Sequence, residues 1–228
     1  IKNDCKKIIF SSSAAIYGKP NRYPITENFK LKPINPYGFS KLMVEKLLAD
    51  MEKANNFKYI SLRYFNASGA NKNFGEMHNP ETHLIPLIMQ VASGRRQNIN
   101  IYGNKYKTKD GTCIRDYVHV ADIADAHVKS VQYLFKFNKS KIFNLGSEGG
   151  RSVYEIIQLS RKITNKKINV KILQKRLGDP SILIASSFKI KKILKWKPKF
   201  ASMKNILQSA WNWEKKLLRT KNLQPQKK

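Results

Sequence analysis

Tyr37 and Lys41 lie four residues apart in the segment NPYGFSK, and Ser13 lies upstream of them. Pro36 suits the first turn of a helix and Asn35 suits its N-cap, so we expect a helix to begin here. On that helix the phenol and the ammonium group share one face. A nearby ammonium group stabilises a phenolate, and a phenolate can act as a base toward an alcohol. The spacing therefore predicts proton removal from a hydroxyl group.

Ser13 is the second group that suits this chemistry. The apolar residues Ile8, Ile9 and Phe10 predict a strand that runs into three serines. A serine at the carboxyl end of a strand can reach the same hydroxyl as the tyrosine. A Tyr-x-x-x-Lys pair alone occurs by chance on many amphipathic helices. The upstream serines and the placement at a helix start favour the catalytic interpretation, in which a hydride leaves the carbon as the base takes the proton.

Eight short segments extend this pattern along nearly the whole chain. Together they closely resemble the UDP-glucose 4-epimerases, which belong to the extended short-chain dehydrogenase/reductase family. The segments, in the order that the family has them, are 10–18 (FSSSAAIYG), 36–45 (PYGFSKLMVE), 62–66 (LRYFN), 80–86 (PETHLIP), 94–96 (GRR), 110–120 (DGTCIRDYVHV), 144–146 (NLG) and 176–180 (RLGDP).

The resemblance implies an isomerase that interconverts UDP-glucose and UDP-galactose. By this resemblance Tyr37 is the base, Lys41 assists it, and Ser13 hydrogen-bonds the sugar oxygen. NAD is expected to accept the C4 hydride, and a 4-keto sugar turns over before the hydride returns to the opposite face. The residues expected at the cofactor are Ser13, Tyr37, Lys41 and Phe65.

The resemblance also implies a set of substrate-binding residues. Arg115 and Arg176 are expected at the diphosphate, Asp179 at the ribose and Tyr102 at the uracil. Leu183 stands where some members have a bulky tyrosine, so an N-acetyl sugar is an open alternative substrate. The complete expected set is Asn66, His83, Leu84, Asn100, Ile101, Tyr102, Arg115, Arg176, Asp179 and Leu183.

Purely structural alternatives exist for the charged members of this set. Arg115 could form a surface ion pair with Asp116, and Arg176 and Asp179 could flank a turn at Gly178. In an epimerase-like fold, the forked guanidinium groups would instead match diphosphate oxygens.

The chain contains no Gly-x-x-Gly-x-x-Gly loop, with which the family begins. We therefore expect a C-terminal fragment that lacks about the first hundred residues of a family member, with an exposed sheet edge. Three alternatives stay open. These are an inactive remnant that binds UDP-sugar weakly, a UDP-GlcNAc 4-epimerase, and a nucleotide-sugar dehydratase. Ala14 and Ala15 disfavour the dehydratase, which usually has an acidic pair there.

Strands and helices alternate along the chain, which predicts an α/β fold with a doubly wound, mostly parallel, Rossmann-like sheet. The resemblance adds a smaller α+β substrate domain. Strands are expected at 7–11, 58–65, 99–102, 117–120, 141–145 and 168–173, and helices at 36–55, 84–93, 121–137, 153–164, 187–194 and 202–218. The dinucleotide-binding remainder is expected at 1–66 and 116–145, the substrate domain at 67–115 and 146–218, and a disordered tail at 219–228.

Composition limits the partners. The net charge is +29, but only nine of the 44 basic residues are arginines and the lysines are dispersed, so specific nucleic-acid binding is not expected. No stretch approaches the roughly 20 apolar residues of a membrane helix.

Two cysteines indicate a reduced, cytoplasmic setting. The four histidines show no metal-ligand spacing, so no metal is expected, and His119 and His127 are expected to be structural. The family resemblance implies a homodimer.

Overall fold

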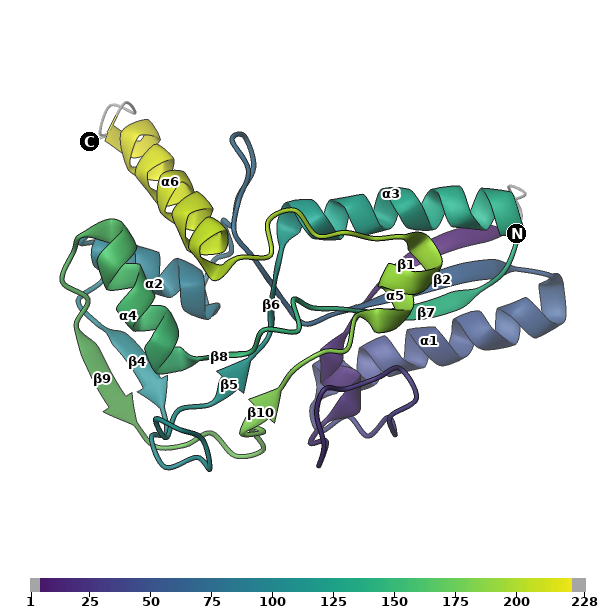
Figure 1. Ribbon diagram of the computed structural model, residues 1–228, viewed down its shortest axis with the longest axis horizontal. Helices are drawn as coiled ribbons and strands as arrows, with labels where there is room; N and C mark the ends of the chain where they lie inside the picture. Colours follow the sequence, from purple (N-terminus) through teal and green to yellow (C-terminus); the bar gives the residue numbers. More distant parts are fainter. Residues whose placement is uncertain (1–4, 223–228) are drawn as a thin grey trace.

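A three-stranded parallel sheet forms one part of the molecule. The computed structural model describes residues 5–222. The strands are β1 (Lys7–Ser13), β2 (Lys58–Tyr64) and β7 (Lys141–Leu145), in the order β1-β2-β7. Helix α1 (Pro36–Asn55) covers one face, and α3 (Val120–Phe137) and α5 (Phe188–Leu194) cover the other (Figure 1).

Alternation along the strands produces these two faces. In β2, Tyr59 packs toward α1, whereas Ile60 and Leu62 join the core beneath α3 and α5. Strand β7 follows the same rule, with Ile142 on the α1 side and Phe143 on the other. Successive side chains of a strand point to opposite faces, so a buried parallel sheet needs apolar residues on both.

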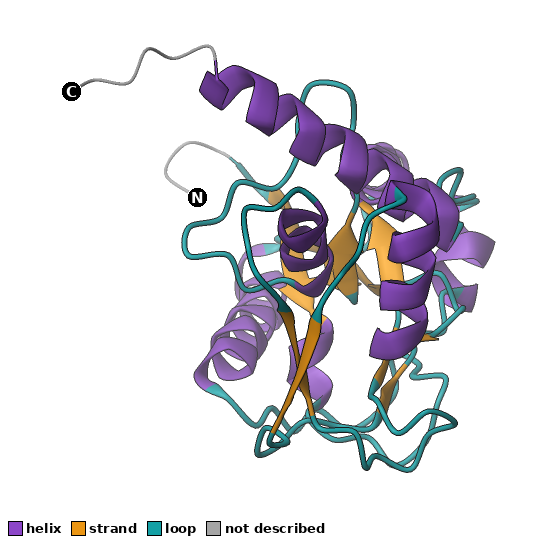
Figure 2. Ribbon diagram, turned by 90° about the vertical axis from the view of Figure 1, so that its left-hand side faces the viewer, coloured by secondary structure: helices purple, strands orange, loops and turns teal. Residues whose placement is uncertain are grey.

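The second part of the molecule surrounds a parallel pair of strands, β4 (Ile99–Tyr102) and β9 (Val170–Leu173). Three helices, α2 (Leu84–Ala92), α4 (Val153–Thr164) and α6 (Met203–Asn222), pack with this pair around one apolar core. Figure 1 shows this part to the left of the central sheet, and Figure 2 views the molecule from that side, with helices flanking the strands.

Short elements join the two parts. Strand β3 (Asn66–Ser68) pairs with β6 (Tyr117–His119), and β5 (Ile114–Arg115) lies between β8 (Arg151–Ser152) and β10 (Ile182–Leu183). A 3-10 helix, η1 (Ala14–Tyr17), follows β1 directly. Two of these short strands carry predicted site residues between the two parts, Asn66 on β3 and Arg115 on β5.

The predicted α/β fold and its principal elements are confirmed. The prediction of a disordered tail from 219 is wrong for residues 219–222, which continue α6, and residues 223–228 lie outside the described part of the chain.

The predicted domain division stays a prediction. Within it, α5 and Trp196 were assigned to the substrate domain, and they pack against the core of the central sheet. Among the described residues, no helix is long and apolar enough to cross a membrane.

Candidate active site

A cavity of about 1260 Å³ lies between the two parts of the molecule. Its walls come from β1, α1, β3, α2, β4 and α6, so residues distant in sequence converge on it. All of the predicted site residues line this cavity except Lys41 and Leu183. A volume of this size is larger than the roughly 300–1,000 Å³ of a typical small-ligand pocket, and it suits an extended ligand.

Helix α1 presents Tyr37 and Lys41 as the sequence predicts. Asn35 caps the helix by accepting a hydrogen bond from the Gly38 N–H at 2.8 Å, and Pro36 occupies the first turn. Lys41 Nζ donates to the Ser11 carbonyl oxygen at 2.9 Å and lies 5.6 Å from the centre of the Tyr37 ring. The lysine is therefore anchored behind the tyrosine, while the Tyr37 side chain lines the cavity.

Ser13 ends β1 and faces the same cavity. Its Oγ accepts a hydrogen bond from the Ala15 N–H at 3.1 Å, which caps η1. A hydroxyl group has one hydrogen to donate as well as its acceptor lone pairs. The cap uses an acceptor position, so the hydroxyl hydrogen of Ser13 can point at an oxygen in the cavity.

A buried polar network behind this site was not predicted. Arg63 donates to Glu45 through Nε (3.0 Å) and to the Tyr17 hydroxyl through Nη1 (2.8 Å). Ser12 Oγ donates to the same carboxylate at 2.6 Å, and Tyr17 donates to Asn144 at 2.7 Å. Burial raises the pKa of Tyr17 to about 12, so this phenol remains protonated. An arginine in the middle of an apolar strand was the available signal, because a buried charge needs a partner.

Arg115 and Asp179 lie together at another wall of the cavity. Arg115 Nη1 donates to the Pro180 carbonyl oxygen at 2.8 Å, and its Nη2 lies 3.4 Å from the Asp179 carboxylate. The alternative pairing of Arg115 with Asp116 is wrong. Asp116 is fully buried and accepts hydrogen bonds from the backbone N–H groups of Ser147 and Ala185. Burial nevertheless raises its pKa.

Arg176 lies over the ring of Tyr102, with 3.7 Å between its Cζ atom and the ring centre. A hydrogen bond from Arg176, and a weaker one from Asn100, lower the pKa of the Tyr102 phenol. The buried Oδ1 atom of Asn100 has no hydrogen-bond partner among the described residues. This wall therefore offers a guanidinium group, an aromatic ring and a vacant amide acceptor.

Asn66 and Phe65 occupy the bend between β2 and β3. Asn66 Nδ2 donates to the Asp116 carbonyl oxygen at 2.6 Å, and its side-chain oxygen remains available as an acceptor. Phe65 is buried, and it packs with Ile16 and Ala185 while lining the cavity. Leu183 packs against this same apolar cluster rather than on the cavity wall.

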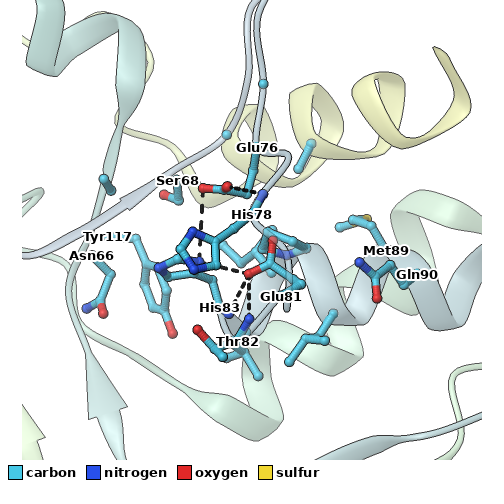
Figure 3. A pocket seen from close by; sticks show the side chains of 18 of the residues that line it. Asn66, Ser68, Glu76, His78, Glu81, Thr82, His83, Met89, Gln90 and Tyr117 are labelled. Atoms are coloured by element: carbon cyan, nitrogen blue, oxygen red, sulfur yellow. Dashed lines mark hydrogen bonds and ion pairs between the residues drawn. The ribbon is translucent and has the colours of Figure 1, made fainter. Parts of the chain in front are cut away.

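His83 immediately precedes α2, whose first residue is Leu84, and its side chain is 55% exposed (Figure 3). Its Nδ1 atom lies 2.8 Å from Glu81 Oε1, which also accepts from the backbone N–H groups of Thr82 and His83. Glu76 Oε2 lies 4.0 Å from the same nitrogen. Sequence reasoning placed His83 near a substrate but did not find this acidic pair.

The two histidines predicted to be structural both have partners within the fold. His119 is buried and caps α3 by accepting a hydrogen bond from the Ala121 N–H. His127 Nδ1 lies 2.9 Å from the Ile123 carbonyl oxygen, and its Nε2 lies 2.8 Å from the Tyr64 hydroxyl. Burial raises the pKa of Tyr64, which lines the cavity near Tyr37.

Comparison with protein families gives a match over more than half of the chain. The model of the "NAD dependent epimerase/dehydratase family" matches residues 1–146.

Individual relatives carry a consistent name. The UDP-glucose 4-epimerase of Halalkalibacterium halodurans is 48% identical over 217 residues, which cover 94% of this chain and 65% of the relative. The UDP-glucose 4-epimerase of Lacticaseibacillus casei is 50% identical over 210 residues, covering 91% of this chain and 63% of the relative. The chain thus spans somewhat less than two thirds of the length of these relatives.

A solved structure adds a similarity in three dimensions. The UDP-glucose-4-epimerase of Stenotrophomonas maltophila, with bound NAD and formylated UDP-arabinopyranose, superposes with a TM-score of 0.90. The two sequences are 35% identical, and the match covers 94% of this chain and 65% of that one.

Proposed function

The chain belongs to the NAD dependent epimerase/dehydratase family, and on this premise we propose that it carries out the 4-epimerisation of UDP-glucose and UDP-galactose. One observation carries the proposal. Ser13 and Tyr37 line the same cavity as Arg115 and Arg176, and Lys41 is anchored directly behind Tyr37. A base, a hydroxyl donor and two guanidinium groups in one cavity suit an alcohol that is attached to a diphosphate.

Tyr37 is the proposed acid–base group. As a phenolate it removes the proton from the sugar 4-hydroxyl, and as a phenol it returns the proton at the end of the cycle. Lys41 supplies a positive charge that stabilises the phenolate, because its Nζ is held near the Tyr37 ring by the Ser11 carbonyl. Ser13 donates its hydroxyl hydrogen to the same sugar oxygen. A positioned acid–base group of this kind typically contributes about 10²–10⁴-fold to the rate.

NAD is the proposed cofactor, and the chemistry that it supplies when bound is hydride acceptance and return at C4. The residues of this chain fit its nicotinamide riboside end. On the cavity wall, Tyr37 and Ser13 offer hydrogen-bonding groups and Phe65 offers an apolar ring. Lys41 lies off that wall, and its ammonium group, which donates to the Ser11 carbonyl oxygen, has further N–H donors for the cofactor. The 228 residues include no Gly-x-x-Gly-x-x-Gly segment, so no residue here is assigned to the cofactor pyrophosphate.

The nucleotide part of the substrate is proposed to bind at the opposite wall. Arg115 and Arg176 would bind the diphosphate, Asp179 a ribose hydroxyl and Tyr102 the uracil ring. Asn66 and the segment at His83 and Leu84 would contact the sugar and its phosphates, and Asn100 and Ile101 would complete the uracil pocket. The vacant, buried Oδ1 atom of Asn100 supports this assignment, because uracil carries an N–H donor that such an acceptor needs.

Sugar preference at the 2-position stays a prediction. The sequence suggests that Leu183 leaves room for an N-acetyl group, yet Leu183 packs behind the wall with Phe65. Any effect of this residue on the sugar would therefore pass through Phe65.

A homodimer in the cytoplasm is part of the same proposal. Phe39, Met43 and Leu47 follow one another at helical spacing on α1 and are 54%, 70% and 59% exposed. An apolar stripe of this kind suits a second copy of the same helix. Met43→Glu should shift the protein toward a monomer in light scattering, whereas Lys46→Glu on the same helix should not.

The function is tested by adding the part of a relative's sequence that the 228 residues do not cover. We define the complemented protein as this chain joined to the portion of the L. casei epimerase that it does not cover. With NAD it should convert UDP-galactose to UDP-glucose. Loss of water to give a 4-keto-6-deoxy sugar would indicate a dehydratase. No product from a folded complemented protein, with the L. casei enzyme active alongside it, would support the inactive remnant.

A further inference from the structure

Two glutamates and one histidine converge at the edge of the cavity, in the segment that precedes α2. Glu76, Glu81 and His83, here called the loop triad, each present one ligand atom, and these atoms lie within 4.8 Å of one another (Figure 3). From this arrangement we propose that the loop triad binds a divalent transition-metal ion, of which zinc is the representative.

The distances suit this assignment. In a tetrahedral zinc site with bonds of about 2.0–2.2 Å, neighbouring ligand atoms lie about 3.4 Å apart. His83 Nδ1 lies 2.8 Å from Glu81 Oε1 and 4.0 Å from Glu76 Oε2, which bracket that separation. An ion therefore enters by replacing the proton between Glu81 and His83, and each of these two distances would change by about 0.6 Å to reach the tetrahedral value.

The backbone on both sides of the triad is fixed by contacts that do not involve an ion. The Trp213 indole on α6 donates to the Glu76 carbonyl oxygen at 2.9 Å. Glu81 Oε1 accepts from the backbone N–H groups of Thr82 and His83, and the Glu81 side chain is only 7% exposed. The Glu81 carboxylate and the Glu76 backbone are thus held in place in advance, which reduces the entropy lost on binding.

The charges around the triad are unusual for this chain. The sequence has 44 basic residues against 15 acidic ones. Among the described residues, however, neither Glu76 nor Glu81 forms an ion pair with a lysine or an arginine, and the one ionisable side chain near both is His83. Their other hydrogen bonds come from backbone N–H groups, that of His78 for Glu76 and those of Thr82 and His83 for Glu81. Because no lysine or arginine neutralises these two neighbouring carboxylates, the site carries negative charge that a divalent ion can neutralise.

The ligand types select the metal. One imidazole and two carboxylates suit zinc and its neighbours, whereas magnesium and calcium prefer sites made of oxygen alone. Coordination through Nδ1 leaves the hydrogen of His83 on Nε2. If the proposed function is correct, His83 then becomes a fixed hydrogen-bond donor to the substrate, but zinc binding itself does not depend on that function.

The test is a zinc titration of the 228-residue chain by isothermal titration calorimetry, after treatment with a chelator. One zinc ion should bind per chain, and magnesium should not displace it. Glu76→Gln and His83→Asn should each weaken binding about 10-fold or more, since replacing even a residue that only hydrogen-bonds a metal ligand lowers the affinity for the metal by about 10–100-fold. Asp50→Asn, which removes an exposed carboxylate from α1, should leave the affinity unchanged.

A second measurement needs no variant. Nuclear magnetic resonance of the imidazole nitrogens should show that zinc shifts His83 Nδ1 and leaves a protonated Nε2. The proposal is overturned if zinc leaves the His83 signals unchanged, or if Glu76→Gln and His83→Asn bind zinc as the unsubstituted chain does. It is also overturned if magnesium competes on equal terms.

Discussion

The Glu45 carboxylate and the Arg63 guanidinium form a buried ion pair with two contacts beneath the candidate active site. Arg63 Nε lies 3.0 Å from Glu45 Oε1, and Nη2 lies 2.5 Å from Oε2. The two side chains are 4% and 2% exposed. Ser12 donates to the same carboxylate, so the pair ties α1, which carries Tyr37, to the strand that ends at Ser13.

Glu45→Ala should strongly destabilise the chain. The substitution leaves the Arg63 charge buried without its partner, and breaking such a pair typically costs about 3–5 kcal/mol. Urea denaturation measures the free energy of unfolding. Glu214→Ala is the control, since Glu214 also binds an arginine through two contacts, but Arg95 is 27% exposed and water can replace its partner. Equal losses from both substitutions would show that burial of the Glu45–Arg63 pair is not what matters.

Gly38→Ala should destabilise the chain although alanine favours helices. An added Cβ would lie 2.7 Å from the Ala15 carbonyl oxygen and 2.9 Å from Pro33 Cβ. This close approach brings the start of α1 against η1, beside Ser13. The intrinsic gain of about 1 kcal/mol for alanine over glycine is smaller than the expected cost of the clash. Thermal unfolding tests this, with the exposed Ser40→Ala on the same helix as control. A more stable Gly38→Ala variant would contradict the close contact.

His119→Asn should remove part of the acid sensitivity of folding. Burial lowers the pKa of His119 below its ordinary value of 6.5, and the charge of Asp122 opposes this effect only in part. As the pH falls through 6.5, the unfolded chain takes up a proton before the native chain does. The native state therefore loses stability from about pH 6.5 down to the native pKa, and not below it.

Stability of the unsubstituted chain and of His119→Asn, measured by urea denaturation between pH 7.5 and 5, should converge as the pH falls. Asn retains an acceptor for the Ala121 N–H, so the cap is partly kept. The exposed His78→Asn should follow the unsubstituted chain. If His119→Asn loses stability just as steeply, another group carries the dependence.

Arg115→Gln and Arg176→Gln should each weaken the binding of UDP. Hydrogen bonds to charged groups are worth about 1.5–3 kcal/mol, which corresponds to about 10- to 100-fold in affinity. Calorimetry with UDP and the chain measures this without any requirement for turnover. Arg151→Gln, at the exposed residue that pairs with Arg115 across β5 and β8, should have little effect. If Arg151→Gln weakened binding as strongly, general positive charge would explain the affinity.

Local signals explain why the start of α1, which carries Tyr37, was predictable. Asn35 and Pro36 act within one turn, and the structure confirms the helix over the predicted residues. The same holds for α4, which begins at the predicted residue 153 and is preceded by a capping box of Ser152 and Glu155. The position of Ser13 at the end of β1 was predictable from the apolar residues before it, because a short apolar run is a local sequence signal for a buried strand.

Contacts between distant segments explain what the sequence did not reveal. Strands β5, β8 and β10 have two residues each and exist only because tertiary packing aligns them. Leu183 lies in one of them, and its distance from the cavity depends on that alignment. Likewise Arg63 meets Glu45 across the sheet and α1, and Glu76 meets His83 across a turn, so neither partner could be identified from spacing alone.

The central claim is that Tyr37 is the acid–base group of a 4-epimerase, and the turnover of Tyr37→Phe in the complemented protein tests it most directly. Phenylalanine keeps the ring but has no hydroxyl group, so kcat for UDP-galactose should fall about 10²-fold or more while the affinity for UDP stays the same. Phe39→Tyr on the exposed face of the same helix should keep full activity. A Tyr37→Phe variant that retains more than half of the original kcat would contradict the account.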